Sequence, residues 1–310
     1  MNIVFLGAPA FAAPTLERVA QSRHKVILVI TQPDRPRDRG MRTTPPPVKQ
    51  KAIEFGIPLL QPEQASSPPV VEQLQRLAPD AAVVVAYGQL LRRNFLSVPR
   101  QGCINLHASL LPRHRGSSPI QAALLSGDRE TGVTTMLLDE GLDTGDILLQ
   151  KAIEITEDDT AATLHDKLAD LGAALVVETL DGLEEGTISP RPQDPRKASM
   201  TKKISKSDAK IDWNQSSRKI CNQTRAFDPW PGCETTHGGR PLKIWKAVAE
   251  DEENVGEPGK ILVAENARLL VQAGRGTVRI LELQLPGGRR MTVDEFLRGH
   301  PIAPGSTFKG

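Results

Sequence analysis

The sequence has few cysteines, few aromatic residues and no long hydrophobic run. Its three cysteines, Cys103, Cys221 and Cys233, form no CxxC pair, which argues against a disulfide framework or a zinc knuckle and predicts buried free thiols. No apolar run approaches the roughly 20 residues of a membrane-spanning helix, and the opening "MNIVFLGAPAF" lacks the basic region of a secretory signal. We therefore expect a soluble, cytoplasmic protein with no membrane partner.

Glycine is also missing where a dinucleotide-binding turn would need it. The stretch 7–14, "GAPAFAAP", has one glycine where the G-x-G-x-x-G fingerprint has three. No GxxxxGK[ST] phosphate loop occurs in the chain. Nicotinamide, flavin and ATP binding are therefore disfavoured, and a nicotinamide oxidoreductase is the weakest of the alternatives.

The charge is small overall but unevenly distributed. Residues 1–190 carry a net charge of −5 and residues 191–310 a net charge of +7, which together give the +2 of the chain. Within 191–225, ten basic residues face three acidic ones. Such a basic segment indicates a polyanionic partner, and the alternative is a solubilising linker.

Short apolar runs alternate with amphipathic helical patterns in the first part of the chain. The runs are 2–7, 25–30, 81–87, 102–107 and 133–138. Continuous apolar runs of this length are typical of strands that are buried on both faces. They predict an α/β fold with a Rossmann-like, doubly wound, mainly parallel sheet, closed by a long helix from Thr160 to about Gly182.

The pattern changes after residue 188. A Pro-, Lys- and Ser-rich stretch without periodicity predicts a basic linker over 189–209. Short strands with Gly-rich turns follow it and predict a smaller C-terminal β-barrel or sandwich over 210–310, with an oligonucleotide-binding (OB-like) barrel as one candidate. The expected first domain is then 1–188.

Asn105 and His107 end one of the predicted strands, in the stretch "NLHASLLPRHRG". Side chains two residues apart on a strand lie on the same face, and open α/β sheets place ligands at the carboxyl ends of their strands. A neutral amide can donate to an oxygen that gains negative charge, and an imidazole beside it can move a proton. The alternative is a structural histidine that follows an ordinary turn.

A second loop, 138–148, concentrates carboxylates after another strand: Asp139, Glu140, Asp143 and Asp146. Their spacing lacks the alternating ligands of a calcium loop, and no G-x-S-x-G elbow supports a serine nucleophile. An amide, an imidazole and a carboxylate without a nucleophilic side chain remain. Such a trio suits direct acyl transfer to a substrate amine, with the tetrahedral oxyanion held by the amide and the imidazole.

These motifs resemble the formyltransferase family that uses 10-formyltetrahydrofolate. The resemblance rests on "NLHASLLPRHRGSSPI" and "GLDTGDIL", and extends over almost the whole chain through "FLGAPAFAAPTL", "TQPDRP", "PPPVK", "VVVAYGQLL", "KIDW" and "RAFDPWPG". It implies a catalytic trio of Asn105, His107 and Asp143. It also implies tetrahydrofolate contacts, which we expect at Ser109, Leu110, Leu111, Pro112, Tyr87, Gly88, Gln89, Leu90 and Asp139.

The chemistry implied by this resemblance requires neither a metal nor a nucleophilic side chain. The folate brings an activated formyl group, and the protein supplies proximity, orientation and oxyanion stabilisation. The expected acceptor is the α-amine of methionine carried by initiator tRNA, as used in translation initiation. The alternatives are a small amine such as an amino sugar, or a non-catalytic RNA-binding protein on a similar scaffold.

Segment 31–51 favours the tRNA acceptor because it is basic and rich in proline. A solvated loop is the alternative. The family pattern implies a tRNA contact for Arg39, although Asp38 stands where relatives tend to have glycine. The expected tRNA contacts are Arg35, Arg37, Arg39, Arg42, Lys202, Lys203 and Lys206. By analogy Phe11 is expected at the methionine pocket, or else in the core, and we expect a monomer.

Overall fold

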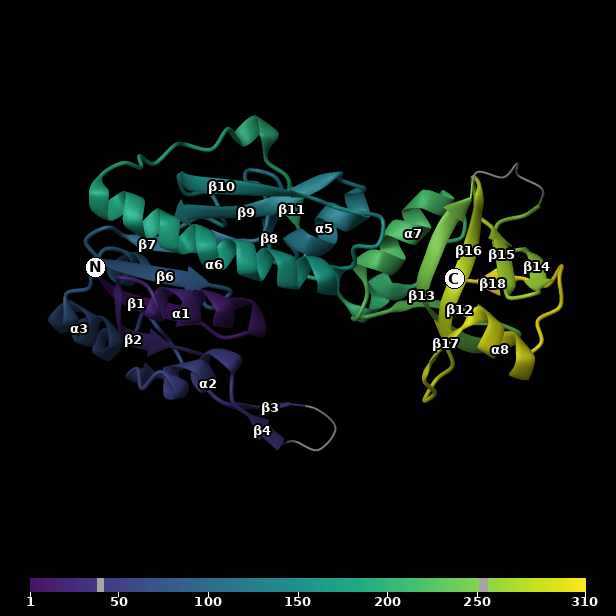
Figure 1. Cartoon of the computed structure of the whole chain (residues 1–310), viewed down its shortest axis with the longest axis horizontal. Helices are drawn as coiled ribbons and strands as arrows, with labels where there is room; N and C mark the ends of the chain where they lie inside the picture. Colours follow the sequence, from purple (N-terminus) through teal and green to yellow (C-terminus); the bar gives the residue numbers. More distant parts are fainter. Residues whose placement is uncertain (38–41, 251–255) are drawn as a thin grey trace. The chain divides into compact units, whose positions relative to one another are not determined.

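The computed structural model describes residues 1–37, 42–250 and 256–310, and the chain divides into two compact units (Figure 1). The first unit comprises 1–119, 130–154 and 165–201, and the second comprises 120–129, 155–164 and 202–310. The first contains a mainly parallel sheet and the second an antiparallel one. The predicted class, an α/β sheet followed by a smaller β domain, is confirmed.

The first sheet has the strand order β10-β9-β7-β6-β1-β2-β5. Its strands are β1 (Asn2–Gly7), β2 (Lys25–Ile30), β5 (Leu59–Leu60), β6 (Ala81–Val85), β7 (Cys103–His107), β9 (Glu130–Leu137) and β10 (Ile147–Glu154). Neighbouring strands pair in parallel through β5, β2, β1, β6 and β7. In contrast, β9 runs antiparallel to β7, and β10 runs antiparallel to β9. The run at 133–138 therefore departs from the parallel series that the sequence suggests.

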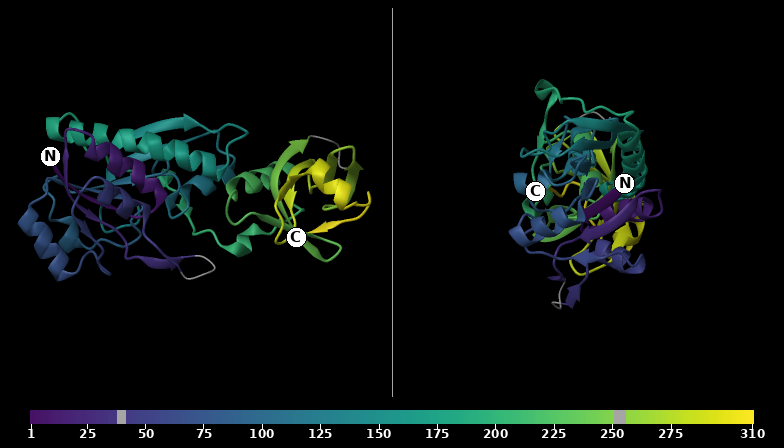
Figure 2. Two further views of the ribbon diagram at one scale, coloured as in Figure 1. Left: turned by 60° about the horizontal axis from the view of Figure 1, so that its bottom comes forward. Right: turned by 90° about the vertical axis from the view of Figure 1, so that its left-hand side faces the viewer.

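Helices cover both faces of this sheet (Figures 1 and 2). On one face, Val71 and Leu74 of α3 (Pro68–Leu77) pack with Val4 and Leu6 of β1 in a continuous apolar core. On the other, α6 (Ala161–Glu185) packs closely enough on β7 and β9 that a Cβ at Gly172 would meet Leu106. Because both faces are covered, the strands are nearly continuous apolar runs.

Shorter elements complete the first unit. They are η1 (Ala10–Ala12), α1 (Ala13–Ala20), α2 (Pro47–Glu54), α4 (Arg93–Leu96), η2 (Pro195–Lys197), the pair β3 (Arg35–Arg37) and β4 (Arg42–Thr44), and the pair β8 (Arg115–Gly116) and β11 (Met200–Thr201). The helix α5 (Pro119–Ser126) lies almost wholly in the second unit. Pro14 stands in the first turn of α1, where its missing N–H costs no intrahelical hydrogen bond.

The second unit is built on an antiparallel sheet. Its strands are β12 (Cys233–His237), β13 (Arg240–Glu250), β14 (Ile261–Glu265), β15 (Arg268–Gln272), β16 (Thr277–Gln284), β17 (Arg290–Thr292) and β18 (Phe308–Lys309). Besides most of α5, its helices include α7 (Ser217–Ala226) and α8 (Val293–Gly299). A bridge between Lys260 and Thr307 joins the two ends of the sheet. The sheet therefore curls into the small barrel that the short strands predict.

The stretch predicted as a linker is divided between the units. Residues 189–201 are counted in the first unit, where Arg191 exchanges backbone hydrogen bonds with Ile147 and β11 pairs with β8. Residues 202–209 are counted in the second, and η3 (Lys206–Ala209) begins there with a capping box at Ser205. The stretch 189–209 thus has no helical or strand periodicity in its sequence, but hydrogen bonds to other segments hold it in place.

The cysteines are free and buried, as predicted. Burial raises the pKa of Cys103 and of Cys221 to about 12, and raises that of Cys233 as well. These thiols are therefore protonated at physiological pH and poorly nucleophilic. Among the described helices, none is long and apolar enough to cross a membrane.

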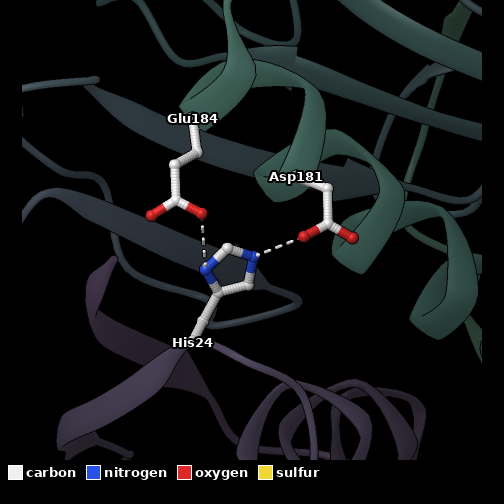
Figure 3. Close-up of side chains that lie close together, drawn as sticks. All are labelled: His24, Asp181 and Glu184. Atoms are coloured by element: carbon white, nitrogen blue, oxygen red, sulfur yellow. Dashed lines mark ion pairs between the residues drawn. The ribbon is translucent and has the colours of Figure 1, made fainter.

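His24 is buried beside two carboxylates of α6 (Figure 3). Its Nε2 lies 3.2 Å from Asp181 Oδ1, and its Nδ1 lies 3.9 Å from Glu184 Oε2. The three side chains are close enough to share a metal ion. However, Arg23 pairs with both carboxylates and the α-amino group of Met1 pairs with Glu184. We interpret the group as a charge-compensated cluster that attaches the start of β2 to the end of α6.

Burial of His24 predicts a loss of stability in mild acid. Desolvation lowers the pKa of this imidazole below 6.5, so below that pH the unfolded chain binds more protons and the free energy of unfolding falls. His24→Gln should reduce the fall measured by urea denaturation between about pH 7.5 and about pH 5.5. His300→Gln, at an exposed position, should keep the parent's fall, and an equal fall in His24→Gln would contradict the prediction.

Candidate active site

The strand β7 places Asn105 and His107 on one face of the first sheet. They stand opposite Met136 and Thr134 of β9, two residues apart on each strand. Asn105 is partly exposed, and its side-chain amide makes no hydrogen bond to another residue within the described part of the chain. Its N–H groups are therefore available to a bound molecule.

Both ring nitrogens of His107 lie close to an oxygen atom of another residue. The side chain is 7% exposed, and Nε2 lies 3.0 Å from the carbonyl oxygen of His114. Since a carbonyl only accepts, Nε2 carries a proton in this contact. The other nitrogen, Nδ1, lies 3.6 Å from Oδ2 of Asp143, which suits an ion pair whenever the ring is protonated. Nδ1 is therefore the ring nitrogen that faces the Asp143 carboxylate.

The carboxylate of Asp143 is fixed by backbone geometry. Its Oδ2 accepts a hydrogen bond of 2.7 Å from the Gly116 amide, and the side chain is 14% exposed. Asp143 itself has φ +53°, a left-handed conformation that few non-glycine residues adopt. Gly116 has φ +111°, and a Cβ there would lie 2.7 Å from the carbonyl oxygen of Thr201. Glycine is thus required at the position that holds the Asp143 carboxylate.

The antiparallel direction of β9 explains how Asp143 reaches His107. Leu137, at the end of β9, pairs with Ile104 near the start of β7, whereas Thr134 pairs with His107. The loop after β9 therefore starts at the opposite end of β7 and must fold back to bring Asp143 beside His107. Glycine is also required at Gly145, where a Cβ would lie 1.7 Å from the Leu137 carbonyl oxygen.

The turn Ser109–Pro112 is built onto β9 and β10. Thr134 Oγ1 donates to the Ser109 carbonyl at 2.6 Å and accepts from the Leu111 amide at 3.1 Å. Gln150 Nε2 donates to the Leu111 carbonyl at 2.9 Å. We did not predict Thr134 or Gln150. A threonine in an otherwise apolar strand is a weak sequence signal for such a role.

The segment Tyr87–Leu90 is partly buried and partly exposed. The Tyr87 ring lies in the apolar core, and burial raises the pKa of its hydroxyl to about 12. Gln89 is anchored, because its Oε1 accepts from the Ala65 amide at 2.8 Å. Gly88 is exposed and Leu90 is 76% exposed. Contact with a ligand is therefore open to Gly88 and Leu90 more than to the Tyr87 ring.

Asp139 serves its own loop in this structure. Its carboxylate accepts from the Thr144 hydroxyl at 2.8 Å and from the Gly141 amide at 3.0 Å. Leu142, three residues further along the same loop, is 58% exposed. Asp139 thus shapes the loop that carries Asp143.

Phe11 lies in η1 and is 7% exposed. Its ring packs edge-on against His165, with 5.4 Å between the ring centroids. Little of the ring is accessible in this conformation.

The predicted basic contacts are distributed over both units. Arg35 is exposed in β3, Arg37 ends β3 and Arg42 begins β4, whereas Arg39 and Asp38 lie outside the described residues. The lysines of the second unit, Lys202, Lys203 and Lys206, are exposed. Lys202 Nζ lies 3.0 Å from Oδ1 of Asp208.

Comparisons with known proteins identify the family of this chain. The family model for formyl transferase matches residues 1–180, and the model for the formyl transferase C-terminal domain matches residues 203–301. The methionyl-tRNA formyltransferase of Nitrosomonas eutropha is 48% identical over 309 residues, 100% of this chain and 98% of that protein. The protein of the same name from Pelotomaculum thermopropionicum is 45% identical over 306 residues, 98% of this chain and 97% of that protein.

A solved structure shares the fold at lower identity. It is the N-formyltransferase from Helicobacter canadensis in complex with folinic acid and dTDP-3-aminofucose, with a TM-score of 0.67 and 19% identity, over 93% of this chain and 99% of that chain. Both family models together span most of the sequence. The chain therefore belongs to the formyl transferase family.

Proposed function

We propose that this chain has methionyl-tRNA formyltransferase activity. It would transfer the formyl group of 10-formyltetrahydrofolate to the α-amine of methionine on initiator tRNA: a bond forms between this amine and the formyl carbon, the bond from the formyl carbon to the folate nitrogen breaks, and N-formylmethionyl-tRNA and tetrahydrofolate are released. Full-length relatives of that name at 45–48% identity support the substrates. The observation that carries the chemistry is the Asn105 side-chain amide, which has no hydrogen-bond partner among the described residues, beside a His107 imidazole that faces the Asp143 carboxylate.

Asn105 is the proposed oxyanion donor. 10-Formyltetrahydrofolate supplies an activated formyl group, and the substrate amine is the nucleophile. As the amine attacks, the formyl oxygen gains negative charge. The side-chain N–H groups of Asn105 can then donate to it without first breaking a hydrogen bond to any residue that the structure describes. A preorganised donor of this kind stabilises the transition state more than the ground state.

His107 and Asp143 are proposed to manage the proton of the attacking amine. The Asp143 carboxylate lies 3.6 Å from Nδ1 of His107, so that the two groups would form an ion pair when the ring takes up a proton during the reaction. A protonated ring adds positive charge near the developing oxyanion, and the carboxylate can accept the amine's proton through water. The proposed route requires no metal and no nucleophilic side chain.

The tetrahydrofolate contacts remain our proposal for Ser109–Pro112, Tyr87–Leu90 and Asp139. Within Tyr87–Leu90, the exposed residues are Gly88 and Leu90. The exposed Leu90 side chain offers apolar surface for an aromatic ring. The turn at Ser109–Pro112 is held by Thr134 next to the His107 end of β7. This arrangement would place the folate beside the catalytic trio.

For the acceptor, we propose that the basic residues of both units bind tRNA phosphates. These are Arg35, Arg37, Arg39, Arg42, Lys202, Lys203 and Lys206. Phe11 remains a proposed wall of the methionine pocket, although its burial requires a side-chain movement for contact. We also propose domain limits at 188 and 210, which family matches that end at 180 and begin at 203 support. A monomer and a cytoplasmic location are further parts of the proposal.

Loss of the oxyanion donor or of the imidazole should slow catalysis. Asn105→Ala and His107→Ala should each lower kcat for formylation of Met-tRNA by about a hundredfold or more, with a modest change in the folate KM, because each removes an interaction that forms in the transition state. Asn94→Ala, at an exposed position, is the control and should retain the parent's kcat. Near-normal kcat in both test variants would refute the assignment.

Loss of the carboxylate should change both rate and pH dependence. Asp143→Asn keeps the shape but removes the charge that faces His107, so kcat should fall by about a hundredfold and the pH profile of kcat should change. Asp146→Asn, in the same loop, should keep the parent's profile. A normal profile in Asp143→Asn would reduce Asp143 to a structural role.

The acceptor can be identified by competition. If tRNA is the substrate, deacylated initiator tRNA should inhibit formylation, and inhibition should weaken as salt increases. Replacing Lys202, Lys203 and Lys206 by alanine should lower the slope of log affinity against log salt by up to about 3. Transfer of labelled formyl to an amino sugar, with no inhibition by tRNA, would instead favour the small-amine alternative.

A further inference from the structure

The side-chain amide of Gln193 joins three segments around the proposed active site. Its Nε2 donates to the carbonyl oxygens of Asp143 at 2.9 Å and Gly145 at 2.7 Å. Its Oε1 accepts from Nε and Nη2 of Arg115 at 3.1 and 2.7 Å. Gln193 therefore contacts the backbone of the loop that carries Asp143, and it also contacts Arg115. The residue after Arg115 is Gly116, whose amide binds the Asp143 carboxylate.

The chemistry of both partners fixes the orientation of this amide. A guanidinium only donates, so it selects the oxygen of Gln193, and backbone carbonyls only accept, so they select its nitrogen. Arg115 is 8% exposed, and a buried guanidinium needs acceptors. A glutamate at 193 could satisfy Arg115 but would turn a carboxylate oxygen toward two carbonyl oxygens. Only an amide of this length meets both demands.

The loop needs such a brace because its backbone is unfavourable on its own. Asp143 has φ +53°, and a residue in the left-handed region persists only where its surroundings hold it. Two contacts hold Asp143 from opposite ends: the Gly116 amide binds its carboxylate, and Gln193 binds its carbonyl oxygen. Release of the carbonyl would free the backbone to relax and turn the carboxylate away from His107.

We propose that Gln193 is a positioning residue that holds the Asp143 carboxylate against His107 and the Gly116 amide. Its role in the reaction rests on the proposed formyl transfer, whereas its effect on Asp143 is a property of the fold. Gln193 does not touch the reacting atoms in this proposal, and it acts through Asp143.

The kinetic test is a double-mutant cycle with Asp143. Gln193→Glu keeps the acceptor for Arg115 and removes the donor, so kcat should fall at least about tenfold while the folate KM changes less than about threefold. In an Asp143→Asn background the same change should alter kcat less than about twofold, because the group through which it acts is already lost. Full additivity of the two losses would overturn the proposal.

A matched control separates positioning from general stability. Gln223 Nε2 also bridges two backbone carbonyls, those of Asp208 and Lys210, at 2.9 and 3.0 Å. Gln223→Glu should therefore impose a similar structural disturbance and leave kcat unchanged. If Gln193→Glu lowers only the melting temperature, as the control does, Gln193 is merely structural and the proposal fails.

Amide exchange tests the same idea without activity. In the full-length protein, the Gly116 amide should exchange at least about tenfold faster in Gln193→Glu than in the parent, because its acceptor is the Asp143 carboxylate. The Arg115 amide, which donates to the Ser199 carbonyl at 2.8 Å, is the internal reference and should be unchanged. Unchanged exchange at Gly116 would overturn the proposal.

A second variant keeps the test valid if a new carboxylate at 193 prevents folding. Gln193→Met adds no carboxylate, removes the donor to the Asp143 and Gly145 carbonyls and also removes the acceptor of Arg115. It should change Gly116 exchange and kcat in the same direction. If the parent transfers no formyl group to Met-tRNA, the proposed function fails, but the exchange measurement still decides whether Gln193 holds Asp143. Parental exchange and parental kcat in Gln193→Met would refute the positioning role.

Discussion

The arrangement of the site depends on one backbone constraint, the left-handed conformation at Asp143. The loop after β9 starts at the end of β7 opposite to His107 and must fold back. The Asp143 carboxylate therefore meets His107 only if the chain turns sharply at Asp143. Glycine at 116 and 145 gives this turn room, and hydrogen bonds from Gly116 and Gln193 hold it. The trio is thus assembled by the loop's supports as much as by the strands.

Local sequence patterns predicted the parts of the site that local structure determines. Asn105 and His107 share a face because strand side chains alternate, and the apolar runs predicted the sheet because its strands are buried on both faces. Asp143 could not be chosen among its neighbouring carboxylates by spacing, and only the family resemblance singled it out. Its position depends on the antiparallel pairing of β9, a long-range feature with no local signal.

Other features were hidden because they depend on tertiary contacts. The stretch 189–201 lacks periodicity and was predicted as linker, yet it supplies β11 and Gln193 to the first unit. Tyr87 and Phe11 belong to motifs that suggested ligand contact, but the structure buries both rings. A single motif can combine an exposed residue such as Leu90 with a buried one such as Tyr87, and sequence spacing does not separate the two.

The pairing of β9 with β7 also limits how the chain can vary in length. Thr134 faces the turn at Ser109–Pro112 because it stands opposite His107 in the register. An insertion or deletion of one residue within β9 would shift its side chains to the other face of the sheet. Insertions and deletions that preserve function are therefore expected outside residues 130–137. The site thus constrains the length of this strand as well as its composition.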